Sequence, residues 1–139
     1  MTSNYVSEGI TFKPGSALGS IFRAELLGLL PQSNISPAFI KLRLCKIDDC
    51  LSKDKWTYVG RTQNTGLDRS EFKISNIIKA INQTQSEFMP FVMLRQNDPR
   101  DLVVENGRHR IAYFFENGFE YIWCVIPAAQ EALFKEHYT

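Results

Sequence analysis

The chain has 139 residues, which is the size of one ordinary domain and long enough to bury a hydrophobic core. Its residues are 44% apolar and 22% charged, the composition of a soluble globular protein, and no low-complexity run points to a disordered or fibrous class. The formal net charge of +1 excludes a global basic field, so any contact with nucleic acid would have to use a local basic patch.

Targeting and metal-binding signals are sparse. Residues 1–12 lack the basic and apolar regions of a signal peptide, and every apolar stretch is far shorter than a membrane span. The cysteines (Cys45, Cys50 and Cys124) form no Cys-x-x-Cys pair, and two histidines are too few for a zinc site. We therefore expect a cytoplasmic protein with free thiols, no membrane association and no dedicated metal site.

The N-terminal part of the chain predicts a strand, a helix and a second strand. Residues 1–15 mix polar and apolar side chains and could hold a short strand. Ser16 is a suitable N-cap for a helix that runs to about Leu30, and Pro31 stops that helix. Residues 39–45 then alternate apolar and polar side chains, which predicts a half-buried strand.

A polar stretch follows this strand. Asp48, Asp49 and Asp54 lack the spacing of a calcium-binding loop, so we expect an ordinary polar loop before Trp56. Residues 56–59 are aromatic and β-branched, which predicts another strand. A turn-rich loop at residues 60–66 carries Arg61, and loops of this kind often overhang a binding site.

The next segment has the clearest helical pattern of the chain. Asp68 or Ser70 can cap this helix, and Arg69 stands at its start. Its isoleucines recur at i, i+3, i+4 and i+7, and we expect this stripe to lie in the core: Ile74, Ile77, Ile78 and Ile81. Arg69 and Arg61 could point at a shared anion; alternatively, both are ordinary surface arginines.

The C-terminal half predicts three strands. Residues 89–90, Met-Pro, lead into residues 91–94, which are apolar at consecutive positions and so expected to be covered on both faces. Turn residues at 96–101 predict that residues 102–104 return antiparallel. Residues 121–126 predict the last strand.

A closing helix and a single domain complete the expected organisation. Pro127 suits the first position of a helix from Ala128 to about His137, with Ala132 and Leu133 packing inward. Because no internal repeat or linker divides the sequence, we expect one domain over residues 1–139.

A turn and a helix follow residues 102–104 directly. Asn106 and Gly107 form a turn pair that tolerates positive φ. Apolar residues at i, i+3 and i+4 then predict a helix: Ile111, Phe114 and Phe115. Gly118 closes this helix, where a left-handed residue belongs.

Three basic residues fall at the start of this helix. Arg108, His109 and Arg110 lie beside unpaired backbone N–H groups, where each cation opposes the helix dipole by a few tenths to about 1 kcal/mol. The placement is favourable if an anion binds there, because the N–H groups, the dipole and both guanidinium groups would converge on it. Alternatively, Glu105 and Glu116 pair with the arginines and His109 is structural, which requires no ligand.

This segment resembles the signature of the ParB/sulfiredoxin superfamily, in which a Gly-x-His-Arg or Gly-x-Arg-Arg turn opens a helix. Residues 107–110 read Gly-Arg-His-Arg, and an amphipathic helix, a Met-Pro pair, an apolar strand and a hairpin precede them in that family's order. The resemblance covers residues 68–127 and is greatest for small plasmid fertility-inhibition proteins of the Osa and FiwA type. It implies an α+β fold with a small mixed sheet flanked by helices.

The resemblance also implies a ligand and a reaction. A nucleotide or nucleic-acid phosphate would be bound by the turn, with two further arginines: Asn106, Gly107, Arg108, His109, Arg110, Arg69 and Arg61. His109 and Glu105 would be the catalytic residues, His109 as the group that transfers a proton. A nucleotide triphosphate with a divalent cation would be the cofactor. The nearest carboxylate for that cation is Glu105, followed by Asp101 and Asp98.

Two departures from the superfamily limit its functions. Arg108 stands where sulfiredoxin needs a cysteine, which excludes sulfinic-acid reduction. Only residues 128–139 follow the last strand, so we expect no helix-turn-helix module for plasmid partitioning. The first hypothesis is therefore a phosphate-binding domain, an ATPase or nuclease if it is catalytic, that acts like a fertility-inhibition factor on the conjugation machinery.

The alternative hypothesis is a non-catalytic immunity or inhibitor protein that covers a protein target such as a toxin. Its support is the aromatic content, which could supply interface anchors: Tyr5, Trp56, Tyr58, Trp123 and Tyr138. A DNA-binding regulator ranks last, because the net charge is low and no helix-turn-helix is recognisable.

Overall fold

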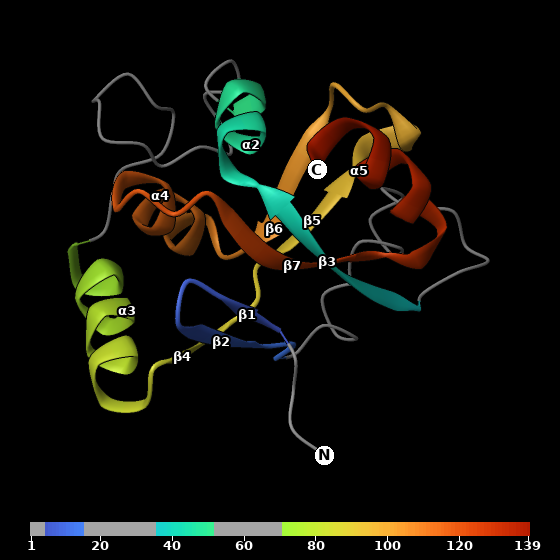
Figure 1. The fold of residues 1–139 in the computed structure, drawn as a ribbon. Coiled ribbons are helices and arrows are strands. Elements are labelled where there is room, and N and C mark those ends of the chain that lie inside the picture. Colours follow the sequence, from blue (N-terminus) through green and yellow to red (C-terminus); the bar gives the residue numbers. More distant parts are fainter. Residues whose placement is uncertain (1–4, 16–35, 52–70) are drawn as a thin grey trace.

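The computed structural model describes residues 5–15, 36–51 and 71–139, which form helices around two small sheets (Figure 1). The elements in chain order are β1 (Val6–Ser7), β2 (Ile10–Lys13), β3 (Pro37–Arg43), α2 (Leu44–Leu51), α3 (Glu71–Thr84), β4 (Ser86–Phe88), β5 (Phe91–Leu94), η1 (Arg95–Asn97), β6 (Leu102–Asn106), α4 (Arg108–Glu116), β7 (Tyr121–Pro127), η2 (Ala128–Gln130) and α5 (Glu131–Tyr138). The α+β class is confirmed. The helix predicted for residues 16–30, the strand at 56–59 and the loop at 60–66 lie outside the described residues.

The larger sheet has the strand order β3-β7-β5-β6. β3 and β7 pair antiparallel along their whole length, from Pro37 opposite Pro127 to Arg43 opposite Tyr121. β5 lies parallel to β7 and antiparallel to β6, and all four of its residues are buried. The predicted antiparallel return and the covering of β5 on both faces are therefore confirmed.

The smaller sheet has the order β1-β2-β4 and brings the N-terminus beside the segment that follows α3. β1 and β2 form a hairpin whose turn residues, Glu8 and Gly9, both have positive φ, as a tight two-residue turn requires. β4 lies parallel to β2, and its alternation buries Glu87 while Phe88 is exposed. β4 has only three residues, too few for a recognisable pattern in the sequence.

The strand predicted for residues 39–45 ends earlier than expected. β3 stops at Arg43, and the chain continues as α2, with Leu44, Ile47 and Leu51 buried at helical spacing. The polar loop expected before Trp56 is therefore wrong at Asp48 and Asp49, which lie on α2, and its remainder lies outside the described residues. The apolar positions after Leu44 recur with the period of a helix, and this period overrides the alternation before it.

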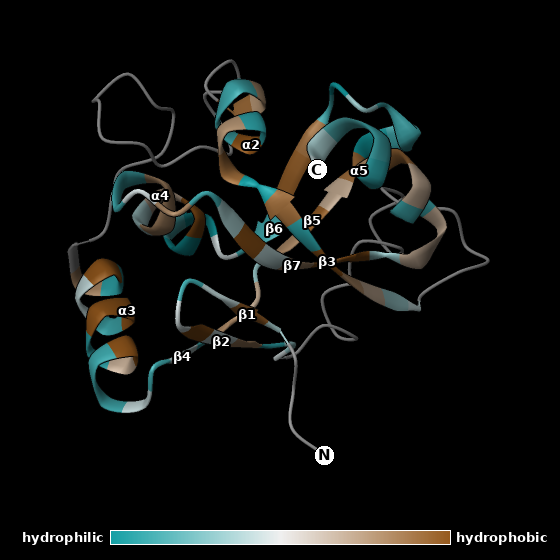
Figure 2. Cartoon of the chain, viewed as in Figure 1, coloured by the Kyte–Doolittle hydropathy of each residue, from teal (hydrophilic) through white to brown (hydrophobic). Residues whose placement is uncertain are grey.

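The helix predicted after Ser70 is confirmed as α3, but its isoleucine stripe is only partly in the core. Ile77 is buried, whereas Ile78 is exposed and the other two isoleucines are half-buried. Figure 2 shows apolar and polar bands alternating along α3. The prediction that the whole stripe is buried is therefore wrong, and α3 rests on α4 and β4 by a narrow contact.

The closing helix begins later than predicted. Pro127 is the last residue of β7, and the single turn η2 separates it from α5. Ala132 is exposed, which corrects its predicted inward packing; Phe134 and Tyr138 are the buried residues of this helix. None of the described helices is long and apolar enough to cross a bilayer.

All three cysteines are free, as expected, and they differ in exposure. Cys45 is exposed, whereas Cys124 is buried in β7, and this burial raises the pKa of its thiol. Because the thiolate is the reactive form, we expect a thiol reagent such as Ellman's reagent to modify Cys45 in the native protein and Cys124 only after unfolding. A Cys45→Ser variant should lose the fast phase of this reaction; persistence of that phase would contradict the assignment.

Candidate functional site

The predicted turn between β6 and α4 is confirmed. β6 ends at Asn106, Gly107 has a φ of 95° in the left-handed region, and α4 begins at Arg108. The first intrahelical hydrogen bond joins the N–H of Ile111 to the carbonyl of Gly107 at 3.0 Å. The N–H groups of the first turn therefore have no acceptor within the helix.

Gly107 is also required by a close approach of the chain. A Cβ atom built on Gly107 would lie 2.6 Å from Cβ and 2.8 Å from Cα of Pro90. Pro90 belongs to the connection between β4 and β5, so the start of α4 rests directly against that connection. A glycine is needed both for the backbone angle and for this contact.

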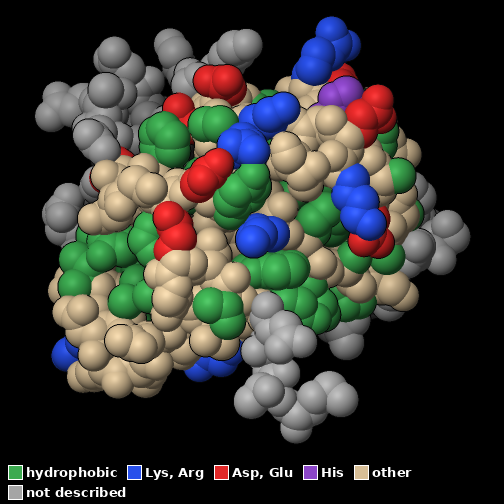
Figure 3. All heavy atoms as spheres, viewed as in Figure 1, with side chains coloured by type: hydrophobic (Ala, Val, Ile, Leu, Met, Phe, Trp, Pro, Cys, Tyr) green, Lys and Arg blue, Asp and Glu red, His purple; other side chains and the backbone are tan. Residues whose placement is uncertain are grey.

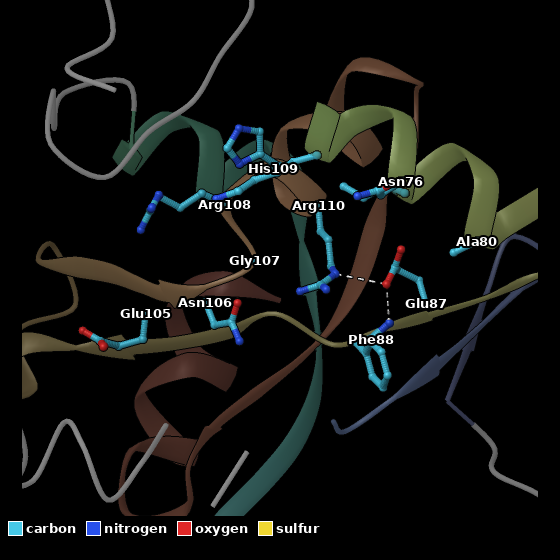
Figure 4. Close-up of a pocket in the computed structure, with 12 residues that line it drawn as sticks. Asn76, Ala80, Glu87, Phe88, Glu105, Asn106, Gly107, Arg108, His109 and Arg110 are labelled. Atoms are coloured by element: carbon cyan, nitrogen blue, oxygen red, sulfur yellow. Dashed lines mark hydrogen bonds and ion pairs between the residues drawn. The ribbon is translucent and has the colours of Figure 1, made fainter. Parts of the chain in front are cut away.

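A pocket of about 410 Å³ opens in front of this turn (Figure 4). Its walls come from α3, β4, the end of β6 and the first turn of α4. The lining residues are Lys73, Asn76, Ile77, Ala80, Glu87, Phe88, Glu105, Asn106, Gly107, Arg108, His109 and Arg110. The structure thus brings the six predicted site residues from 105 to 110 to one pocket, whereas Arg61 and Arg69 lie outside the described residues.

Arg110 is held at this pocket by Glu87, a residue that was not predicted from the sequence to belong to the site. Its Nε donates a hydrogen bond to Oε1 of Glu87 at 3.1 Å, and the same oxygen accepts the backbone N–H of Phe88 at 2.7 Å. The guanidinium carbon lies 5.8 Å from the ring centre of Phe88. The terminal nitrogens of Arg110 have no hydrogen-bond partner among the described residues, so they remain able to donate to a ligand.

The other two basic residues point in different directions. Figure 4 shows Arg108 extending away from Arg110, on the far side of Gly107. The imidazole of His109 is only 8% exposed and is turned away from the Arg110 guanidinium (Figure 4). Two converging guanidinium groups were expected here, and the structure places one of them, that of Arg110, beside Glu87.

The carboxylates proposed for a divalent cation do not gather at the pocket. Glu105 lines it, but Asp98 and Asp101 lie at the opposite end of β6. The backbone N–H of Arg100 donates to Asp98 and lowers the pKa of that carboxyl, and Asp101 lies 3.8 Å from Arg95. Of the three carboxylates considered for the cation, only Glu105 therefore lines the pocket, and no group of three potential ligands occurs among residues 5–15, 36–51 and 71–139.

The charged groups at this site are a few side chains that line the pocket. Figure 3 shows acidic and basic side chains interspersed on one face of the molecule, without a continuous basic patch. The pocket itself has three cationic lining residues and two carboxylates: Lys73, Arg108, Arg110, Glu87 and Glu105. An anionic ligand would therefore be recognised by a few directed groups and not by a broad field.

The chain has no recognisable relative among the known proteins with which it was compared. The chain matches no family model, and it has no significant match among curated proteins or solved structures.

Proposed function

We propose that this protein binds a phosphate-bearing ligand, a nucleotide or a nucleic-acid phosphate, in the pocket at the start of α4. The observation that carries the proposal is Arg110, which is fixed through Nε by Glu87 and turns its terminal nitrogens to the pocket. A guanidinium held in this way donates two parallel hydrogen bonds to a phosphate and loses little side-chain entropy on binding.

The backbone of α4 supports the same proposal. The N-terminus of a helix carries roughly half a positive elementary charge and presents N–H groups without intrahelical acceptors. Gly107 has no side chain to cover these groups, so an anion can approach the backbone closely. A phosphate here would offset the repulsion between the helix dipole and the arginines that follow Gly107.

Binding is better supported than hydrolysis. His109, the proposed proton-transfer residue, is buried and turned away from Arg110 (Figure 4). Of the carboxylates considered for the divalent cation that phosphate hydrolysis commonly uses, only Glu105 lines the pocket. We therefore propose a phosphate-binding domain that resembles the ParB/sulfiredoxin superfamily and has a role like that of fertility-inhibition proteins. The proposed activity is binding of the ligand, not its hydrolysis.

The alternative of a protein-binding inhibitor loses part of its support. Tyr5 and Trp123 pack edge to face with ring centres 4.9 Å apart, and Tyr138 is buried with its hydroxyl donating to the carbonyl of Pro99. These aromatic residues stabilise the fold itself. Trp56 and Tyr58, the other two proposed anchors, lie outside the described residues.

Calorimetric titration with ATP, CTP and a short DNA duplex tests the proposal. We expect Arg110→Ala to weaken binding of the preferred ligand by at least about tenfold, because it removes charge-assisted hydrogen bonds. Arg95→Ala is the matched control, since Arg95 is exposed and faces Asp101. Identical titrations of the wild type and Arg110→Ala would contradict the proposal.

Arg110→Ala also leaves the Glu87 carboxylate buried without its cation, which could impair folding. The double variant Arg110→Ala/Glu87→Ala removes both partners and avoids this cost. The double variant should fold, and it should bind the ligand more weakly than the wild type does. Retention of wild-type affinity by the double variant would likewise count against a role of Arg110 in binding.

A further inference from the structure

We propose that the ligand of this pocket carries a hydroxyl group near its phosphate and that Glu87 accepts the hydrogen bond of this hydroxyl. This inference rests on the proposed function and narrows its ligand class. It favours a phosphorylated sugar, such as the ribose of a ribonucleotide, over the backbone of DNA. Glu87 then determines specificity, while Arg110 binds the phosphate.

The position of the Glu87 carboxylate is fixed on one side. Oε1 accepts two hydrogen bonds, one from Nε of Arg110 at 3.1 Å and one from the backbone N–H of Phe88 at 2.7 Å. The residue is only 5% exposed, because β4 turns this side chain inward beneath α3. Two directed hydrogen bonds to one oxygen determine where the other oxygen must point.

The second oxygen, Oε2, points into the pocket. Figure 4 shows it turned toward α3, where Asn76 and Ala80 form the opposite wall. No described residue donates a hydrogen bond to Oε2. Oε2 is therefore open to the pocket and has unused acceptor capacity, so a hydroxyl of a bound ligand can donate to it.

The charge of Glu87 decides which phosphates suit the pocket. A carboxylate beside a bound phosphate repels it, and this repulsion is strong where water is excluded. A hydroxyl between the two anions donates to the carboxylate and offsets the repulsion. The sugar hydroxyls of a ribonucleotide can do so, whereas the phosphodiester backbone of DNA offers no hydroxyl along the chain.

The rest of the pocket fits a small molecule of this kind. Its volume of about 410 Å³ lies in the range of small-molecule sites and is too small for a nucleic-acid duplex. Ile77, Ala80 and Phe88 give it an apolar side opposite the charged groups at the start of α4. Part of the ligand can therefore be apolar or flat while its phosphate and hydroxyl face Arg110 and Glu87.

The test compares ATP and CTP with their 2′,3′-dideoxy counterparts by calorimetry on the full chain. For the wild type we expect removal of the hydroxyls to weaken binding by at least about tenfold, the cost of a lost hydrogen bond to a charged group. In Glu87→Ala the ratio of the two affinities should fall to near one, even if both affinities decrease. A purely structural role of Glu87 would lower both affinities and leave the ratio unchanged.

Two further variants keep the test decisive. Glu87→Gln retains an acceptor for Arg110 and Phe88, so it should fold and still show a reduced ratio. Glu136→Gln, at an exposed glutamate of α5 outside the pocket, should keep the wild-type ratio. Equal wild-type affinity for ribonucleotides and dideoxynucleotides overturns this inference alone, whereas no binding of any phosphate ligand overturns the proposed function as well.

Discussion

Replacing Gly107 with alanine is expected to lower the free energy of unfolding by about 2–5 kcal/mol and to abolish ligand binding. Part of the cost is conformational, because Gly107 has a φ of 95°, and an alanine in the left-handed region costs about 1–2 kcal/mol. The rest is steric: the new Cβ would lie 2.6 Å from Cβ of Pro90, and overpacking of this kind costs about 1–3 kcal/mol. Urea denaturation followed by circular dichroism measures the total.

Gly118→Ala is the matched control for this prediction. Gly118 also has positive φ, 83°, but nothing lies within 4 Å of its Cβ position. The control should therefore lose only the conformational part, about 1–2 kcal/mol, and should leave ligand affinity unchanged. If the two variants are equally stable, the contact between Gly107 and Pro90 does not constrain the start of α4.

Local signals explain which parts of the site could be predicted from the sequence. The Asn-Gly pair at residues 106–107 and the apolar spacing after it specify a turn and a helix within a dozen residues, so both could be located. The same holds for β5, whose consecutive apolar residues require burial on both faces. These features depend on neighbours in sequence and not on tertiary contacts.

Glu87 could not be predicted because its role depends on a contact between distant residues. It lies 23 residues before Arg110, in a strand of three residues that forms only by pairing with β2 near the N-terminus. A single glutamate before an apolar run is a weak signal by itself. Closeness in the chain favours Glu105 and Glu116 as partners of the arginines, but Arg110 pairs with Glu87.

The ion pair of Arg110 with Glu87 does not exclude binding of an anion by the same side chain. Its Nε contacts Glu87, while its terminal nitrogens have no partner among the described residues. The glutamate offsets the cost of a cation at a helix N-terminus and holds the guanidinium where a phosphate can bind it.

The position of α4 itself depends on a second residue, and Phe114→Ala is expected to lower the free energy of unfolding by about 3–5 kcal/mol. Phe114 is fully buried, with its ring centre 5.3 Å from that of Phe12 on β2 and 4.6 Å from that of Phe119. It therefore joins α4 to the smaller sheet. Truncation to alanine leaves a cavity between elements that cannot close without moving the helix.

Phe72→Ala tests whether this loss comes from burial. The substitution is chemically the same, but Phe72 is 75% exposed on α3, so the change should stay within about 0.5 kcal/mol of the wild type. Both variants are compared by urea denaturation at matched protein concentration. A loss below about 1 kcal/mol for Phe114→Ala would show that α4 is not anchored through this ring, and the rigid start of α4 that phosphate binding requires would then need another support.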